Sequence, residues 1–362
     1  MAEYALQMTN IVKSYSGVTV LSNVDFSVRQ GEIHALLGEN GAGKTTLMNI
    51  LGGVTPMDSG KIVRFGKEVK LHSPADSQAE GVAFIHQELN VVNDLMVYEN
   101  MFLGYELRNR AGMLDVREMC RQTEEVFARM NVKINPRAMM STLETSYKQI
   151  VEIAKSLLRN DKLIIMDEPT TSLTQKEIEN VFSIMRGLTK EHGVTVIFIS
   201  HKLTEVVDFC DSYTVLRNGE KVAEGNITQP DGTKISQADL ARMMVGKDVL
   251  GVNVYKEHEI GEVILEVRDL TVDTRVKGVS FDLHRGEILG FTGLLGDGKE
   301  ELVRAIFGDL RKTSGTVRFK GKTLNLKHPA QGRKHGIGFL PSNRKENAII
   351  KDLSVQENIT IV

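Results

Sequence analysis

The sequence repeats itself after 255 residues, and an internal repeat of this length constrains the fold more than any single motif. The segment "GEIHALLGENGAGKTTL" from Gly31 aligns with "GEILGFTGLLGDGKEEL" from Gly286. At the same separation, "DSGKIVRFGK" from Asp58 aligns with "TSGTVRFKGK" from Thr313. Further along, "DLMVYEN" matches "DLSVQEN". The chain is therefore expected to contain two copies of one domain.

The second copy is shorter than the first. Its counterparts of Leu143, Asp167 and His201 would fall after Val362, so we expect the chain to be truncated within the second copy. The segment between the copies contains the turn-rich "NITQPDGTKIS" and a stretch without clear periodicity. The predicted division is a first domain at 1–225 with a helical subdomain at about 88–160, a linker or domain end at 226–261, and a partial second domain at 262–362.

Apolar runs and amphipathic stretches alternate along the first copy. "EIHALLG", "KLIIMDE" and "GVTVIFISH" are short apolar runs of the kind that form buried strands. Between them lie predicted helices at 116–130, 147–158 and 175–190. Alternation of buried strands with helices predicts an α/β fold with a mostly parallel core sheet.

A phosphate-binding loop follows the first apolar run. Gly38 to Thr45, "GENGAGKT", fits G-x-x-x-x-G-K-[ST] between a predicted strand and a predicted helix. Backbone N–H groups of such a loop bind phosphate oxygens, Lys44 reaches the β- and γ-phosphates, and Thr45 offers a hydroxyl to Mg²⁺. A glycine-rich turn without a ligand is the alternative. The predicted nucleotide-binding residues are Gly38, Glu39, Asn40, Gly41, Ala42, Gly43, Lys44, Thr45 and Thr46.

Two acidic residues end the run "KLIIMDEP". Asp167 is expected to bind Mg²⁺, and Glu168 to act as general base toward an attacking water. Alone, this pair would equally suit a strand that runs out to solvent. Gln87 in "FIHQELN" is a further candidate for metal and water, and His201 in "FISHKL" for the γ-phosphate. By itself, His201 would more simply be a capping or surface histidine.

Tyr15 in "VKSYSG" is a candidate platform for stacking on adenine, although a half-buried strand tyrosine explains it nearly as well.

The order of these motifs resembles that of the ATP-binding-cassette ATPases. "VEIAKSL", "MDEPTTSLT", "FISHKL" and "TVLRNGEKVAEG" are similar to the double-cassette ATPases of bacterial monosaccharide importers of the ribose and galactose/methylgalactoside type. The resemblance implies a P-loop fold with an antiparallel β subdomain and a helical subdomain, with ATP and Mg²⁺ as ligands. It also implies a membrane permease as partner, docked on the helical subdomain, and indirect coupling to a sugar-binding protein. Ribose, galactose and xylose are all possible cargoes.

The chain departs from the family pattern at the signature that contacts nucleotide on the opposite cassette. Where LSGGQ is typical, this chain reads "LETSYKQ" from Leu143, with Glu144 and Tyr147 as replacements. Thr174 stands where many cassettes have aspartate.

The second phosphate loop, "GLLGDGKE" from Gly293, also departs from the pattern. Glu300 replaces the metal-binding hydroxyl, and Asp297 adds a second carboxylate. Carboxylates this close to a polyphosphate oppose its binding by about 1 kcal/mol or more. We therefore expect weak nucleotide binding at the second loop. Because the second signature would lie after Val362, residues 1–362 are expected to bind Mg·ATP and to hydrolyse it slowly.

Composition limits the remaining possibilities. The net charge of −2 gives no strong attraction to nucleic acid, and no apolar run approaches the ~20 residues of a membrane span. Cys120 and Cys210 are expected to be free thiols. The predicted location is the cytoplasmic face of the membrane, reached through the permease. The alternatives are a soluble double-cassette ATPase that acts on ribosomes or nucleic acid, and a nucleotide-sensing module without turnover.

Overall fold

The computed structural model describes residues 3–86, 90–170, 173–246, 259–293, 296–341, 348–350 and 352–361. The chain forms two compact units, Met1–Val252 and Asn253–Val362.

A six-stranded sheet in the order β10-β9-β3-β8-β7-β6 is the centre of the first unit. Five strands are parallel, and β10 pairs antiparallel with β9 at the edge. This confirms the predicted mostly parallel sheet. The strands are β3 (Ile33–Leu37), β6 (Val82–Ile85), β7 (Leu163–Asp167), β8 (Thr195–Ile199), β9 (Ser212–Arg217) and β10 (Glu220–Asn226).

Both faces of this sheet are covered along its five parallel strands, which explains why those strands are apolar without alternation, unlike the edge strand β10. Leu163 and Ile165 point from β7 into one core, which also contains Phe26. Ile164 and Met166 point to the opposite core, with the side chains of helices. Each of the five parallel strands therefore contributes side chains to two separate hydrophobic cores.

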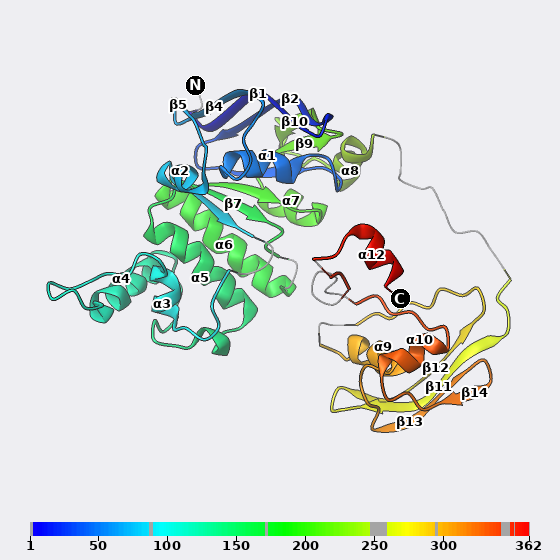
Figure 1. Ribbon diagram of the computed structural model, residues 1–362. Helices are drawn as coiled ribbons and strands as arrows, with labels where there is room; N and C mark the ends of the chain where they lie inside the picture. The colour runs from blue at the N-terminus through cyan, green and yellow to red at the C-terminus, as the bar shows by residue number, and fades with distance from the viewer. Residues whose placement is uncertain are drawn as a thin grey trace. The chain divides into compact units, whose positions relative to one another are not determined.

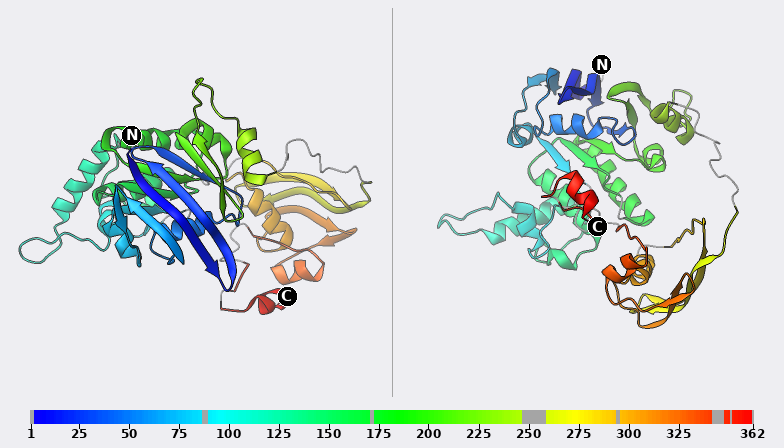
Figure 2. Two further views of the ribbon diagram at one scale, coloured as in Figure 1. Left: turned by 90° about the horizontal axis from the view of Figure 1, so that it is seen from above. Right: turned by 45° about the vertical axis from the view of Figure 1, so that its right-hand side comes forward.

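The first of these cores lies under an antiparallel sheet in the order β2-β1-β4-β5. Helix α1 lies between this sheet and the parallel one, and Figure 2 shows the β1–β2 pair from above. The elements are β1 (Tyr4–Tyr15), β2 (Val18–Arg29), β4 (Ser59–Arg64), β5 (Lys67–Val69), α1 (Lys44–Leu51) and α2 (Pro74–Ala79).

Helices cover the other face (Figure 1). The three predicted helices are confirmed as α4 (Val116–Arg129), α5 (Thr145–Leu158) and α6 (Gln175–His192). Helix α4 begins where the Asp115 side chain accepts a hydrogen bond from the Glu118 N–H, as an N-cap does. The remaining elements are α3 (Val97–Phe102), the 3₁₀ turn Met140–Thr142 and α7 (Leu203–Phe209).

Helix α8 (Gln237–Val245) was not predicted; it lies within residues 226–261, which the sequence indicates as a linker or domain end. The Ser236 side chain caps it by accepting from the Asp239 N–H, and Leu240 is fully buried. The helix therefore packs as part of the first unit.

The second unit repeats the antiparallel sheet of the first. Its order is β12-β11-β13-β14, which matches β2-β1-β4-β5 strand for strand. A helix follows its phosphate-loop sequence, as α1 does in the first unit. The elements are β11 (Val263–Val272), β12 (Val276–His284), β13 (Ser314–Phe319), β14 (Lys322–Leu324), α9 (Lys299–Phe307), α10 (Pro329–Lys334) and α12 (Val355–Thr360).

The parallel sheet has no counterpart among the described residues of the second unit. Ile288 corresponds to Ile33 in the repeat, yet Ile288 is 95% exposed and Ile33 is 0% exposed. Leu340, in the segment that corresponds to β6, is also exposed. In the first unit β3 pairs with β8 and β9, and no described strand fills those positions beside Ile288.

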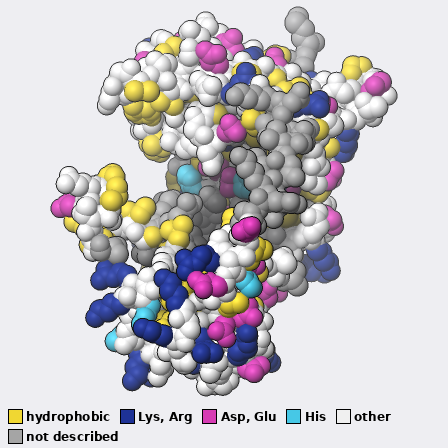
Figure 3. All heavy atoms as spheres, turned by 90° about the vertical axis from the view of Figure 1, so that its right-hand side faces the viewer, with side chains coloured by type: hydrophobic (Ala, Val, Ile, Leu, Met, Phe, Trp, Pro, Cys, Tyr) yellow, Lys and Arg dark blue, Asp and Glu magenta, His cyan; other side chains and the backbone are white. Residues whose placement is uncertain are grey.

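Charges of both signs are interspersed on the face shown in Figure 3. The second unit contains ion pairs such as Arg268 with Asp282 and Arg285 with Glu262. Such mixing agrees with the net charge of −2. Within the described ranges, no helix combines the length and apolarity needed to cross a membrane.

Candidate nucleotide-binding site

Three neighbouring parallel strands of the first unit end at the same edge of the sheet. Ile199, the last residue of β8, pairs with Leu36 of β3 on one side and with Asp167 of β7 on the other. The carboxyl ends of parallel strands are the usual place for a ligand in an α/β sheet. This register brings together the phosphate loop after β3, the acidic pair at the end of β7 and His201 after β8.

The phosphate loop is shaped by its glycines. Gly38 has a φ of 151°, and a Cβ there would lie 2.4 Å from the Leu216 carbonyl oxygen. Gly43 has a φ of 100° and caps α1. The Lys44 Nζ donates hydrogen bonds to the carbonyl oxygens of Gly38 at 2.7 Å and Glu39 at 3.1 Å. The amine of Lys44 is thus held against the backbone of its own loop.

Glu168 and His201 are in direct contact, although 33 residues separate them in sequence. The His201 Nδ1 lies 2.8 Å from the Glu168 Oε1. Glu168 has a left-handed φ of 48°, which is unusual for a residue other than glycine, and its N–H donates to the Ile199 carbonyl. This turn at the end of β7 brings the carboxylate to the histidine. Such strained backbone is found preferentially at functional sites.

A cavity of about 700 Å³ lies where these groups meet. Lys44 contributes the amine, Glu168 the carboxylate and His201 the imidazole. The other lining residues are Gly38, Glu39, Asn40 and Met244, the last from α8. The cavity combines a cation, backbone groups of a glycine-rich loop, a carboxylate and an imidazole, which suits a phosphorylated ligand.

Burial and mutual proximity shift the pKa values of the charged groups here. Burial lowers the pKa of Lys44, while Asp167 and Glu168 oppose that shift. Burial also raises the pKa of Asp167, with a further contribution from the negative charge of Glu168. Asp167 and Glu168 are neighbouring carboxylates, and Asp167 is partly desolvated. A divalent cation beside them would stabilise their charged forms.

The donor set fits Mg²⁺ as a shared ligand of protein and phosphate. Asp167 supplies a carboxylate at the end of β7, and Thr45 supplies an exposed hydroxyl in the first turn of α1. In the described part of the chain no group of three or more His, Cys, Asp or Glu could hold a metal. Mg²⁺ commonly takes one or two protein ligands together with phosphates and water, so this sparse set is appropriate.

Glu205 is a buried residue of the site that the sequence did not reveal. Its Oε2 accepts a hydrogen bond from the Thr170 Oγ1 at 2.7 Å and lies 3.4 Å from the Ser200 Oγ. The Lys202 Nζ lies 3.1 Å from its Oε1. Glu205 thereby connects the segment after Glu168 to the segment around His201. A lone glutamate in the first turn of a helix gives no sequence signal for this role.

Several predicted residues in the described part of the chain are not among those that line this cavity: Tyr15, Gly41, Ala42, Gly43, Thr45, Thr46 and Asp167. Tyr15 ends β1 with an exposed ring, 5.3 Å from the Lys13 Nζ, and is not among the residues that line the cavity. Gln87 lies outside the described residues. The other predicted residues of the loop, Gly41, Ala42 and Thr46, lie at the turn and the first turn of α1.

The phosphate loop of the second unit contains a carboxylate that pairs with the lysine of the same loop. Asp297, which replaces Ala42 of the first loop, places its Oδ2 2.7 Å from the Lys299 Nζ. The Lys299 N–H donates to the Asp297 Oδ1 at 3.1 Å, and the hydrogen bonds from Lys299 lower the pKa of Asp297. A Cβ on Gly293 would lie 1.6 Å from the Asp297 Oδ2. The carboxylate therefore lies over the start of the loop.

Glu300 has a different position in the second loop. It lies in the first turn of α9, with half of its side chain exposed, and its Oε1 is 4.0 Å from Arg304. An acidic residue at a helix start is favourable to the helix dipole, and here it stands where Thr45 carries its hydroxyl.

The phosphate loop, the acidic residues at the end of β7 and the histidine after β8 meet at one edge of the sheet, beside one cavity. This combination defines a P-loop nucleotide-binding protein. The sequence pattern of the ABC transporter family matches residues 21–171 and 276–360. The chain belongs to this family of ATPases. Both copies of the repeat fall within matched segments.

Relatives of known name cover nearly the whole chain. A putative ribose/galactose/methyl galactoside import ATP-binding protein of Hahella chejuensis is 38% identical, over 99% of this chain and 68% of the relative. The ribose import ATP-binding protein of Lactococcus lactis strain IL1403 is 41% identical, over 98% of this chain and 71% of the relative. This chain thus spans about two thirds of the length of these relatives.

Solved structures share the fold. A nucleotide-free ATP-binding cassette from an ABC transporter superposes with a TM-score of 0.57 at 23% identity, over 70% of this chain and all of that one. The cbiO1 protein of Clostridium perfringens, part of the ABC transporter complex cbiONQ, gives a TM-score of 0.55 at 24% identity, over 62% of this chain and 89% of that one. These likenesses establish the cassette fold.

Proposed function

We propose that this chain is the ATP-binding and ATP-hydrolysing subunit that powers import of a monosaccharide of the ribose or galactose type through a membrane permease. The names of its relatives supply the cargo class. The observation that carries the ATPase role is the convergence of Lys44, Glu168 and His201 on one cavity.

The roles of the residues follow from their positions. Lys44 and the loop N–H groups would bind the β- and γ-phosphates, with Thr45 and Asp167 as ligands of Mg²⁺. The metal would neutralise charge that develops on the phosphates. Glu168 would take a proton from the attacking water. His201 holds the Glu168 carboxylate and would contact the γ-phosphate.

The second loop would bind nucleotide weakly. Its lysine is paired with Asp297, and Glu300 stands in place of the metal-binding hydroxyl. A phosphate that binds there would have to break the Lys299–Asp297 ion pair. In a pair of cassettes, ATP would therefore be hydrolysed at the first loop.

The partner we propose is the permease, docked on the helical side of the first unit, with the sugar-binding protein acting through it. This places the chain on the cytoplasmic face of the membrane as a peripheral subunit. Tyr15, whose ring is exposed, would stack on adenine, and Gln87 would link nucleotide to the docked permease.

Reconstitution tests this proposal. The chain is combined with the permease in lipid vesicles, and phosphate release is measured with and without the sugar-loaded binding protein. We expect ATPase activity that rises with the loaded binding protein and accompanies uptake of labelled ribose or galactose. Activity stimulated by RNA or ribosomes, with no response to the permease, would contradict it.

A further inference from the structure

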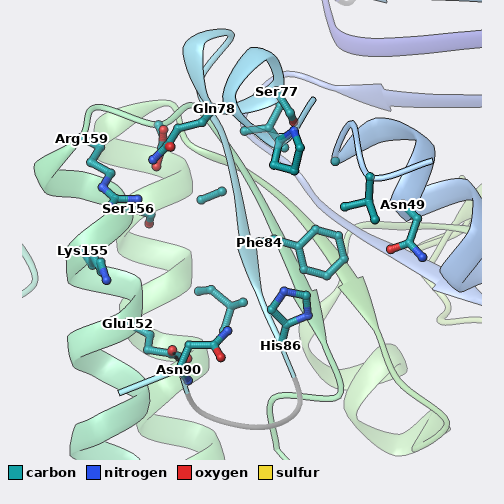
Figure 4. Close-up of a pocket in the computed structure, with 17 residues that line it drawn as sticks. Asn49, Ser77, Gln78, Phe84, His86, Asn90, Glu152, Lys155, Ser156 and Arg159 are labelled. Atoms are coloured by element: carbon teal, nitrogen blue, oxygen red, sulfur yellow. Dashed lines mark hydrogen bonds between the residues drawn. The ribbon is translucent and has the colours of Figure 1, made fainter. Parts of the chain in front are cut away.

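Two helices of the first unit each line a cavity with their side chains. Helix α5 lines a groove of about 420 Å³ beside β6, to which it contributes Glu152, Lys155 and Ser156 (Figure 4). Helix α8 reaches the nucleotide cavity instead, through Met244. The two cavities share no described lining residue, so Met244 belongs to the nucleotide cavity alone.

Met244 differs in chemistry from the rest of the nucleotide cavity. The other described residues that line it are glycine or carry polar side chains: Gly38, Glu39, Asn40, Lys44, Glu168 and His201. Backbone N–H groups and charged side chains serve to bind phosphate, whereas a thioether does not. Met244 is partly buried and packs against the hydrophobic core that the helices cover. An apolar and flexible side chain at this place can exclude water and adapt its shape to a ligand.

Leu240 determines which face of α8 is turned inward. Its side chain is fully buried, and Met244 follows four residues later on the same face of the helix. The helix is capped at its start by Ser236, whose side chain accepts a hydrogen bond from the Asp239 N–H, and at its end by Gly246 with a φ of 75°. The position of Met244 is therefore set by core packing and by both ends of the helix.

The end of β9 holds α8 beside the phosphate loop. Arg217, the last residue of β9, donates a hydrogen bond from its Nη1 to the Met243 carbonyl oxygen at 3.3 Å. The preceding residue, Leu216, presents its carbonyl oxygen to Gly38, where a Cβ would lie only 2.4 Å away. One strand end thus contacts both α8 and the loop that would bind the phosphates.

The contact between Glu168 and His201 is partly open to solvent. The Glu168 side chain is 26% exposed and the His201 side chain 62%. Polar groups interact more strongly when water is excluded, so a cover over this pair would strengthen the contact between them. Among the described residues that line the cavity, Met244 is the one with an apolar side chain to offer.

We propose that Met244 is a positioning residue for ATP hydrolysis, which closes the nucleotide cavity beside Glu168 and His201 and keeps bulk water from them once Mg·ATP is bound. The inference rests on the proposed ATPase function and adds α8 as a wall of the site. Met244 would act through Glu168, because a shielded carboxylate keeps its contact with His201 while it orients the attacking water. Since the role is shielding, leucine should replace methionine and alanine should not.

The first experiment compares Met244→Ala with Met243→Ala in the reconstituted complex. Met243 is the neighbouring residue of α8, packs against the same core and is not among the described residues that line the cavity. We expect Met244→Ala to lower kcat about three- to tenfold with KM nearly unchanged, and Met243→Ala to leave both within about twofold of wild type. Met244→Leu, which nearly conserves volume, should keep kcat within about twofold of wild type. An equal loss of kcat in the two alanine variants would show a packing role and overturn the proposal.

A second experiment tests the contact in the free chain, without turnover. The methionine methyl groups are isotope-labelled for NMR, and the signals of Met243 and Met244 are assigned from their leucine variants. Mg·ATP should shift the Met244 signal, and it should shift the Met243 signal much less. An unchanged Met244 signal in a chain that calorimetry shows to be saturated with Mg·ATP overturns the proposal. Absence of ATP binding in calorimetry contradicts the proposed function itself.

Discussion

The Glu168 Oε1 and the His201 Nδ1 lie 2.8 Å apart, and this contact joins the ends of two adjacent parallel strands. Asp167 of β7 pairs with Ile199 of β8, so the carboxylate one residue beyond β7 comes near the imidazole two residues beyond β8. The left-handed backbone of Glu168 completes the approach. The histidine therefore orients the carboxylate that we propose as the general base.

Changing Glu168 to glutamine should separate binding from hydrolysis. The amide keeps the shape and can still hydrogen-bond His201, but it cannot accept a proton. We expect nucleotide affinity to stay within a few-fold of wild type while the ATPase rate of the reconstituted complex falls by about 10²–10⁴-fold. Titration calorimetry and phosphate release measure the two quantities. Retained turnover would remove Glu168 from the role of base.

Changing Lys44 to alanine should weaken ATP binding strongly, and the equivalent change at Lys299 should not. Lys44 lies over an open loop, whereas Lys299 is paired with Asp297. Loss of a charged hydrogen bond to phosphate corresponds to about 1.5–3 kcal/mol, or at least a tenfold rise in Kd. Fluorescent-nucleotide binding to both variants checks this. Loss of binding with Lys299→Ala alone would reverse our assignment of the two loops.

Changing Glu205 to alanine should reduce both stability and turnover. The change leaves the Thr170 hydroxyl without its buried acceptor and removes the ion-pair partner of Lys202, which costs about 1–3 kcal/mol in the free energy of unfolding. Because Glu205 connects the segments that carry Glu168 and His201, we expect kcat to fall while KM changes little. Glu205→Gln, which keeps an acceptor oxygen for Thr170, should recover part of kcat. A loss of stability with kcat unchanged in the folded protein would limit Glu205 to a structural role.

The stability of the free chain should fall as the pH rises from about 4.5 to about 7. Burial raises the pKa of Glu152 to about 7 and that of Asp161 to about 6, so the folded chain binds more protons than the unfolded chain in this window. The neighbouring cations Lys155 and Arg159 limit the shifts. In Glu152→Gln the decline should shrink by on the order of 2 kcal/mol. Urea unfolding from pH 4.5 to 8 measures it, and identical slopes for both proteins would refute the prediction.

Much of the first unit could be predicted because local sequence and tertiary environment agree there. Buried strands covered on both faces are apolar throughout, and helices with one buried face show helical periodicity. The residues of the phosphate loop and the two strand ends could be named because their chemistry requires particular residue types at fixed places. Helix α8 was missed because it is short and follows a turn-rich segment, so its burial depends on contacts with distant parts of the chain.

Other features depend on contacts between segments far apart in sequence. Glu205 became part of the site because α7 places it beside Thr170, which is 35 residues earlier. The pairing of Asp297 with Lys299 also required a structure, since the sequence indicated only that a carboxylate stands near the loop. The groove at Glu152 brings α5 against β6 and the end of α1, a contact that no periodicity shows.

By itself, the sequence determined which segments repeat, which residues can bind phosphate and which runs are apolar enough for a buried strand. Only the tertiary structure decided which of those runs become strands. Ile33 and Ile288 have equivalent positions in the repeat, but Ile33 is buried in β3 between β8 and β9, while Ile288 is exposed outside any described strand. The physical reason is that a parallel strand is stabilised by hydrogen bonds and packing from neighbours far away in the chain, which its own residues cannot supply.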